Sequence, residues 1–254
     1  MYDRVVIVDW SAASRRHAKP RADAIWLGIH EAGAAWEEYL PSRQEAEARL
    51  LALAEGRVLI GCDFAFGAPQ GLAQRLTGAE SAPALWHYLE ARIQDGRDMV
   101  NNRFAVAAGM NRALGAPVFW GCPAGVAGPD MPARKLARPE TIGLPERRAC
   151  ERRLSGTQPF WKLYTTGSVG SQALMGMPML ARLAREGFAV WPWAEGRVTL
   201  AEVWPSLLPL PQGPEIRDQR QVRALAAAFF ARPPRLTAPD CGAEGWILGP
   251  EGAI

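Results

Sequence analysis

Two aspartates in this sequence each follow a run of aliphatic residues. Asp9 ends the stretch RVVIVD, and Asp63 ends the stretch VLIGCD. Carboxylates that crowd together repel each other unless a cation lies between them, and ligands made only of oxygen favour Mg²⁺ or Mn²⁺ over zinc. Such metals activate water and stabilise the leaving oxygen of a phosphodiester. The pair therefore predicts a metal-dependent acidic site, with two structural carboxylates as the alternative.

Two further acids follow a related pattern. Glu202 ends the stretch VTLAE, and Asp218 stands near the start of the helical pattern RDQRQVRALAAAFFARPP. Glu202 is a candidate catalytic residue, although an ordinary exposed residue at a strand end would look the same. Asp218 is a second candidate, although an aspartate at this place is also a natural helix N-cap.

The elements that must position Asp9 and Asp63 lie in the first quarter of the chain. Aliphatic or alternating patterns predict strands over 4–10, 23–30, 34–40 and 57–63. Between the last two strands, the pattern of residues 41–56 predicts a helix. This helix begins with the capping box Ser42-x-x-Glu45 and is expected to end at Gly56.

Residues 67 to about 190 have a different composition, with many glycines and prolines and no strong strand pattern. Helical patterns cover 84–96, 144–156 and 166–187, and we expect the last of these helices to be interrupted near Pro178. Regular order returns with a strand within 196–208 and a helix over 217–234. The region 67–190 is therefore predicted to be a long, mainly helical insertion.

The order of these elements indicates the fold. Three antiparallel strands followed by parallel strands with crossover helices form a mixed α/β sheet that is covered on both faces. This is the element order of an RNase H-like domain, and we predict one such domain over residues 1–254. Ligands of open α/β sheets bind at the carboxyl ends of the strands, where Asp9 and Asp63 are expected to lie side by side.

Six short segments stand out along the chain: VDWSAAS, GCDFAFGAPQG, LYTTGSVGSQ, AEVWPSLL, DQRQVRALAAA and EGWILG. In this order they resemble an uncharacterised bacterial family of RNase H-like domains that are described as predicted nucleases. The resemblance implies metal-dependent hydrolysis of phosphodiesters, with Mg²⁺ or Mn²⁺ as cofactor. It also implies a metal site formed by Asp9, Asp63 and an acid on the last helix, here Asp218, with Glu202 nearby.

The last helix departs from the pattern of related nucleases. Nucleases of the resolvase type place an aspartate directly before an Ala-Leu pair, whereas the Ala-Leu pair at 224–225 follows Gln-Val-Arg. The nearest acid is Asp218, one to two turns earlier. Either Asp218 reaches the metal site, or the third ligand is missing and the domain binds a ligand without cutting it.

The stretch DWSAAS also fits the phosphate-binding turn of actin-like ATPases and sugar kinases, which makes Ser11 a candidate substrate-binding residue. Those proteins close two domains of this fold on a nucleotide, and one is visible here. The chain also has no P-loop motif. The alternative function is a non-catalytic or phosphotransfer domain that binds a nucleotide or cofactor.

The predicted insertion supplies further candidates for substrate binding. The stretch NNRF offers Asn102 and Arg103 for the polar edges of a substrate, and TTGSVGSQ offers Ser168 and Ser171 at a helix start. Backbone N–H groups at such a start bind phosphate, with a plain helix-entry turn as the alternative. An insertion that begins after Asp63 begins beside the acidic site. We therefore expect these four residues near Asp9, and a nucleic acid or nucleotide-like phosphate ligand as partner.

The composition limits the kinds of partner, metal site and cellular location that we expect. A net charge of +3 and a pI near 8.8 permit an anionic partner without demanding one. The four cysteines form no Cys-x-x-Cys pair, which argues against zinc, and the arginines of 144–156 spread around a helix that we expect to be solvated. Neither a signal-peptide core nor an apolar run of membrane-spanning length occurs. We expect a cytoplasmic protein without membrane contact.

Overall fold

The computed structural model describes residues 1–165 and 167–254. Its sheet contains β1 (Arg4–Asp9), β2 (Ile25–Glu31), β3 (Ala34–Leu40), β4 (Val58–Cys62), β5 (Ala189–Val190), β6 (Val198–Val203), β7 (Ile247–Gly249) and β8 (Gly252–Ala253). The strand order is β3-β2-β1-β4-β6-β7-β8, and β5 pairs with β6 outside this path.

The directions of the strands confirm the predicted fold class. β1–β2 and β2–β3 are antiparallel pairs, whereas β1–β4, β4–β6 and β6–β7 are parallel pairs. Residues 5–8 of β1 are fully buried, as expected for a central strand that is covered on both faces. The result is the mixed α/β sheet of three antiparallel and then parallel strands, with a helical segment between β4 and β6.

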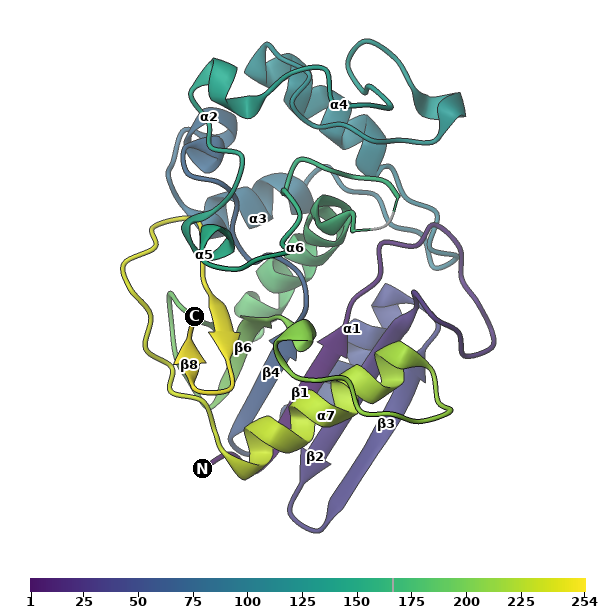
Figure 1. Ribbon diagram of the computed structural model, residues 1–254, viewed down its shortest axis with the longest axis vertical. Helices are drawn as coiled ribbons and strands as arrows, with labels where there is room; N and C mark the ends of the chain where they lie inside the picture. The colour runs from purple at the N-terminus through teal and green to yellow at the C-terminus, as the bar shows by residue number, and fades with distance from the viewer. Residues whose placement is uncertain (166) are drawn as a thin grey trace.

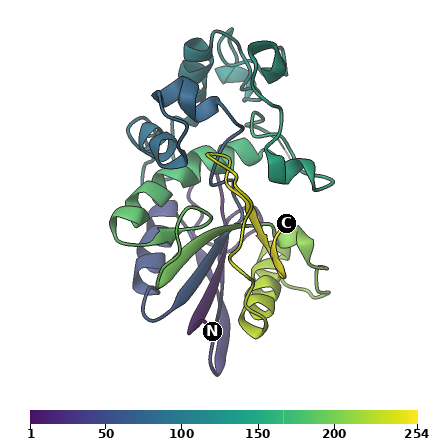
Figure 2. The same cartoon turned by 90° about the vertical axis from the view of Figure 1, so that its left-hand side faces the viewer.

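Helices cover both faces of the sheet. Helix α1 (Arg43–Ala52) and helix α6 (Val169–Arg185) lie on one face, and helix α7 (Arg217–Ala231) lies on the other (Figures 1 and 2). Ser42 caps α1 as predicted, because its side chain accepts a hydrogen bond from the Glu45 amide. Gly28 of β2 allows α7 to approach closely, since a Cβ there would lie 2.5 Å from the backbone of Val222.

The segment between β4 and β6 forms a layer of helices at the carboxyl ends of the strands (Figure 1). Besides α6 it contains α2 (Leu72–Thr77), α3 (Ala82–Glu90), α4 (Arg103–Leu114) and α5 (Ala149–Arg152), with short 3-10 turns at Ala124–Val126 and Pro139–Ile142. A third 3-10 turn, Pro205–Leu207, follows β6. The part of the chain described by the structure contains no helix long and apolar enough to span a membrane.

Two local predictions for this segment were wrong. Helix α6 continues through Pro178 without interruption, because the neighbouring residues are buried in the core and packing outweighs the lost backbone hydrogen bond. The predicted helix over 144–156 shortens to the single turn of α5. Its arginines do not all face solvent, since Arg148 is only 1% exposed.

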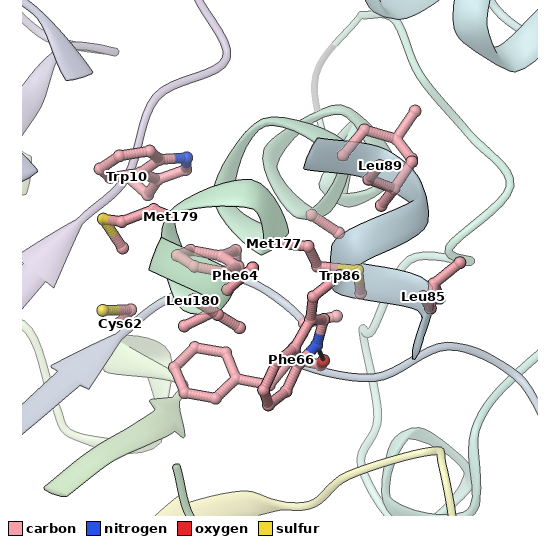
Figure 3. Packing of buried hydrophobic residues seen from close by; sticks show 14 of the residues in the cluster. Trp10, Cys62, Phe64, Phe66, Leu85, Trp86, Leu89, Met177, Met179 and Leu180 are labelled. Carbon is pink, nitrogen blue, oxygen red and sulfur yellow. Dashed lines mark hydrogen bonds between the residues drawn. The ribbon is translucent and has the colours of Figure 1, made fainter. Parts of the chain in front are cut away.

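Aromatic packing anchors the chain directly after β4. Phe64 and Phe66 stand at the start of the helical segment and are buried between α6 and α3, where their rings contact each other (Figure 3). The indole of Trp86 donates a hydrogen bond to the Phe66 carbonyl at 2.6 Å. A Cβ at Gly176 of α6 would lie 2.4 Å from the Phe64 ring, so this position requires glycine. The backbone on either side of Asp63 is therefore held by the sheet and by this core.

Candidate active site

The carboxyl groups of Asp9 and Asp63 form a hydrogen-bonded pair. Asp9 is the last residue of β1, and Asp63 directly follows β4, its parallel neighbour. The register pairs Val8 with Cys62, so the residues that follow them, Asp9 and Asp63, lie side by side. The Trp10 amide also donates a hydrogen bond of 2.6 Å to Oδ1 of Asp63. The expectation that the two side chains lie close together on adjacent strands is thus confirmed.

The pair holds protons more tightly than ordinary carboxylates. Burial raises the pKa of Asp9 well above its usual range, and the charge of Asp63, the hydrogen bond to it, and the charges of Asp218 and Asp23 raise it further. Burial raises the pKa of Asp63 to about 6, against the lowering effect of hydrogen bonds from Asp9 and Trp10. The two groups titrate together, and the larger rise in pKa places the proton of the pair on Asp9, whose carboxyl group donates to Asp63.

A pocket of about 420 Å³ opens beside Asp9. We call it the Asp9 pocket. Its acidic side consists of Asp9, Asp23 and Asp218, and Arg103 contributes a positive charge. The remaining lining residues are 10–13, Ala24, 163–165, Gly167, Ser168, Ser171 and Gln172. The pocket therefore places carboxyl groups and a guanidinium around one space.

Arg103 is the cation of this pocket and is 7% exposed. Its Nε donates to the Ser171 hydroxyl at 3.0 Å, and its Nη1 donates to Ser14 at 2.8 Å and to Asn101 at 2.7 Å. Among the described residues, no carboxylate forms an ion pair with it. Burial lowers the pKa of Arg103 to about 10, and the charge of Arg43 contributes. Arg103 is thus a buried cation held by neutral groups, which leaves its charge for an anion.

Asp218 lies in the Asp9 pocket, but not in the role of a helix cap. The N-cap of α7 is Ile216, so the N-cap prediction for Asp218 was wrong. Its Oδ2 instead accepts a hydrogen bond of 2.9 Å from the amide of Asp23, 195 residues away in the chain. Its charge raises the pKa of both Asp9 and Asp63. Asp218 therefore acts on the pair through its electric field.

Within the described residues, no three His, Cys, Asp or Glu side chains converge closely enough to hold a metal ion. Asp9, Asp63 and Asp218 do not form a ready-made ligand set of three. The Asp9–Asp63 pair can supply two oxygen ligands to one hard cation, with water or substrate completing its coordination.

Glu202 occupies a different environment from the Asp9–Asp63 pair. It is 4% exposed, and Arg148 binds both of its oxygens, with distances of 2.5 Å from Nη2 and 2.7 Å from Nη1. Oε2 also accepts from the Phe66 amide at 3.1 Å. Arg148 in turn pairs with Glu151 at 2.7 Å. These contacts fully engage Glu202 and favour a structural role, and the alternative of an ordinary exposed residue at a strand end was wrong.

The predicted substrate-binding residues do not all face the Asp9 pocket. Ser11, Arg103, Ser168 and Ser171 line it. Asn102 faces away, because its amide donates to the Arg92 carbonyl at 2.9 Å and its oxygen accepts from the Gln94 amide at 2.8 Å. Its expected position near Asp9 was wrong. Thr166, part of the predicted phosphate-binding turn, lies outside the described residues.

No local sequence pattern marks two further residues of the site. Asp23 lines the Asp9 pocket and has a φ of +54°, and Gln172 of α6 donates a hydrogen bond of 2.6 Å to the Trp10 carbonyl. Each of them contacts a segment that lies far away in the chain. Asn101, the first amide of the stretch NNRF, orients Arg103.

Comparisons with family models, with curated proteins and with solved structures found no match. Any functional conclusion about this chain therefore rests on its own residues.

Proposed function

We propose that the protein hydrolyses phosphodiesters with the help of Mg²⁺ or Mn²⁺ bound at Asp9 and Asp63. The observation that carries the proposal is the arrangement of the Asp9 pocket. Asp9, whose carboxyl group shares a proton with Asp63, borders the same space as Arg103, a buried cation without a carboxylate partner among the described residues. Sites of this kind suit a ligand that brings both a cation and an anion, such as a metal-bound phosphate.

The residues of the pair fit a hard cation. Both offer carboxylate oxygens, burial raises both pKa values, and the charge of Asp63 raises that of Asp9 further, so a cation would replace the shared proton. When bound, Mg²⁺ or Mn²⁺ supplies Lewis-acid stabilisation of charge on phosphate oxygens. Asp218 and Asp23 add negative charge at the edge of the pocket, which favours a divalent over a monovalent ion.

Arg103 would bind and orient the phosphate. Guanidinium groups hold phosphate oxygens through paired hydrogen bonds, and Ser171, Ser14 and Asn101 fix the direction of this one. Ser168, the N-cap of α6, and Ser171 in its first turn also line the pocket. The mixed sheet, which is compatible with an RNase H-like domain, also agrees with this proposal.

The alternative is a domain that binds a nucleotide or cofactor without cutting it. One observation favours it, namely that the described residues contain no cluster of three metal-ligating side chains. Under this alternative, Arg103 still binds phosphate, but metal ions do not promote turnover.

A cleavage assay separates the two functions. The protein is incubated with single-stranded, duplex and branched DNA, with RNA, and with bis(p-nitrophenyl) phosphate, in Mg²⁺, Mn²⁺ or EDTA. We expect cleavage that requires metal and falls at least about 100-fold in Asp9→Asn, since the lost charge removes a metal ligand. Asp130→Asn is the matched control, because Asp130 is an exposed partner of Arg112. Metal-independent activity, or equal loss in both variants, would contradict the proposal.

A further inference from the structure

A second pocket borders the Asp9–Asp63 pair from the side of Asp63. It has a volume of about 270 Å³, and we call it the Trp204 pocket. Gly167 lines both pockets, Ser168 lines the Asp9 pocket, and Val169 lines the Trp204 pocket. Since Asp9 and Asp63 share a hydrogen bond, the two spaces meet at the carboxyl pair and at one turn of the chain.

The lining of the Trp204 pocket differs in chemistry from that of the Asp9 pocket. Its apolar and aromatic part comes from β6, β7 and the chain after β4, and its neutral polar part from the loop before α6 and the turn after β6. The apolar residues are Phe64, Ala65, Val169, Val203, Trp204 and Ile247, and the neutral polar ones are Thr157, Gln158 and Ser206.

The charges of the Trp204 pocket disfavour an anion. Arg148 is its cation, but Glu202 and Glu151 both bind this guanidinium. Asp63 adds a third carboxyl group, so negative groups outnumber the positive one. The carboxyl groups would repel a phosphate here, and the guanidinium of Arg148 is already occupied by Glu202 and Glu151. An uncharged group would instead contact apolar surface.

We propose that the Trp204 pocket binds a nucleobase of the substrate while the adjacent phosphate lies in the Asp9 pocket. This inference rests on the proposed function and names its substrate class as nucleotides and their phosphodiesters. A flat, uncharged ring suits a space lined by an indole and aliphatic side chains, with Thr157, Gln158 and Ser206 for the polar ring edge. The volume is below the roughly 300–1,000 Å³ of pockets for whole drug-sized ligands, in keeping with one part of a ligand.

The test measures binding of adenosine 5′-monophosphate, uridine 5′-monophosphate and ribose 5-phosphate by calorimetry, each in Mg²⁺ and in EDTA. None of the three contains a phosphodiester, so hydrolysis does not disturb the measurement. The base is the only difference between the nucleotides and ribose 5-phosphate. We expect at least one nucleotide to bind about 5- to 100-fold more tightly than ribose 5-phosphate in the same buffer, the range of base–aromatic stacking.

Two variants of Trp204 locate the effect. Trp204→Ala removes the ring, and Trp204→Leu removes its flat face but retains apolar packing, which guards against misfolding. Both should bind the nucleotide nearly as weakly as ribose 5-phosphate, while binding of ribose 5-phosphate stays unchanged. Trp36→Leu is the matched control, since Trp36 is a partly buried tryptophan of β3, paired with Ile29 and remote from the pair.

Equal binding of both nucleotides and ribose 5-phosphate would overturn the inference, as would a base preference that survives in both Trp204 variants. The outcomes for the two proposals are separable. A protein that cleaves bis(p-nitrophenyl) phosphate but shows no base preference loses only the nucleobase site. A protein that shows the base preference but cleaves nothing keeps the nucleobase site and loses the hydrolytic function.

Discussion

Asp9 and Asp63 share a hydrogen bond at the ends of two neighbouring parallel strands, although they stand 54 positions apart in the chain. One of two hydrogen-bonded carboxyl groups must hold a proton, and the larger rise in pKa belongs to Asp9. Burial therefore favours a bound proton in the metal-free site. Under the proposed function, a divalent cation would displace this proton from the same oxygens.

The first prediction concerns Asp9→Asn. The substitution keeps the shape of protonated Asp9 and retains a donor toward Asp63, and this donor does not depend on a bound proton. In EDTA, the variant should be as stable as the wild type or more so. In Mn²⁺, it should gain less melting temperature than the wild type, because it has lost one ligand. Thermal melts of both proteins in the two buffers measure this.

A purely structural Asp9 gives the opposite result for Asp9→Asn. Loss of a charge that accepts hydrogen bonds would cost about 1–3 kcal/mol of unfolding free energy whether or not metal is present. A destabilised variant together with a wild type whose melting temperature ignores Mn²⁺ would rule out the metal site.

The second prediction is a pH dependence of the metal-free protein. A carboxyl group whose pKa is higher in the folded state contributes stability that is present at low pH and lost as the pH rises. For Asp63 the window runs from the ordinary value of 3.8 to about 6. The wild type should lose about 1–3 kcal/mol across this window relative to Asp63→Asn. Urea unfolding in EDTA at a series of pH values measures the difference.

Using the difference between these two proteins cancels other titrating groups, such as Glu38 and Glu90, whose pKa values are lowered by arginine partners. A flat difference curve would show that burial does not raise the pKa of the pair.

The third prediction concerns Arg148→Met. Without this guanidinium, Glu202 and Glu151 remain buried with no cation beside them. Removal of one partner of a buried ion pair costs about 3–5 kcal/mol, and the loss should shrink at low pH, where the carboxylates gain protons. Chemical denaturation at pH 5 and pH 8 measures it. Arg152→Met, at an exposed position of the same helical turn, should stay within about 0.5 kcal/mol of the wild type.

The fourth prediction concerns Arg103→Gln. The cost of burying the charge offsets the hydrogen bonds that it makes, so stability should stay within about 1 kcal/mol of the wild type. Phosphate binding in Mg²⁺ should weaken about 10- to 100-fold, as expected for a lost charged hydrogen bond. Calorimetric titration with inorganic phosphate measures this. Unchanged affinity would exclude Arg103 from the anion site.

Local sequence patterns account for much of the fold and for the centre of the site. Asp9 and Asp63 each follow a run of aliphatic residues. Because neighbouring parallel strands end at the same edge of the sheet, the residues at their carboxyl ends lie close together. Patterns within short stretches of sequence also predict the three antiparallel strands, the N-cap at Ser42 and the helical segment after β4.

The wrong predictions involve contacts between distant segments. Asp218 has the local signature of a helix cap, but its partner is Asp23, at the other end of the chain. Arg148 stands in a run of charged residues, which predicts an exposed side chain. The structure instead buries it in an ion pair with Glu202 of β6. Asn102 and Arg103 are neighbours in one polar stretch, but at the start of α4 their side chains point in different directions. Arg103 lines the Asp9 pocket, whereas Asn102 donates to the Arg92 carbonyl. One-dimensional patterns do not encode these pairings.

Asp9 ends β1 and Asp63 directly follows β4, with its amide bonded to the Val8 carbonyl, while Arg103, Ser168 and Ser171 lie further along the connection between β4 and β6. Such a connection can change its length and composition over generations without shifting the register of the strands that it joins. Under the proposed function, the residues that would bind the metal and those that would bind the phosphate are thus inherited on separate parts of the chain. We expect descendants of this scaffold to keep the aspartates while exchanging the groups that face them.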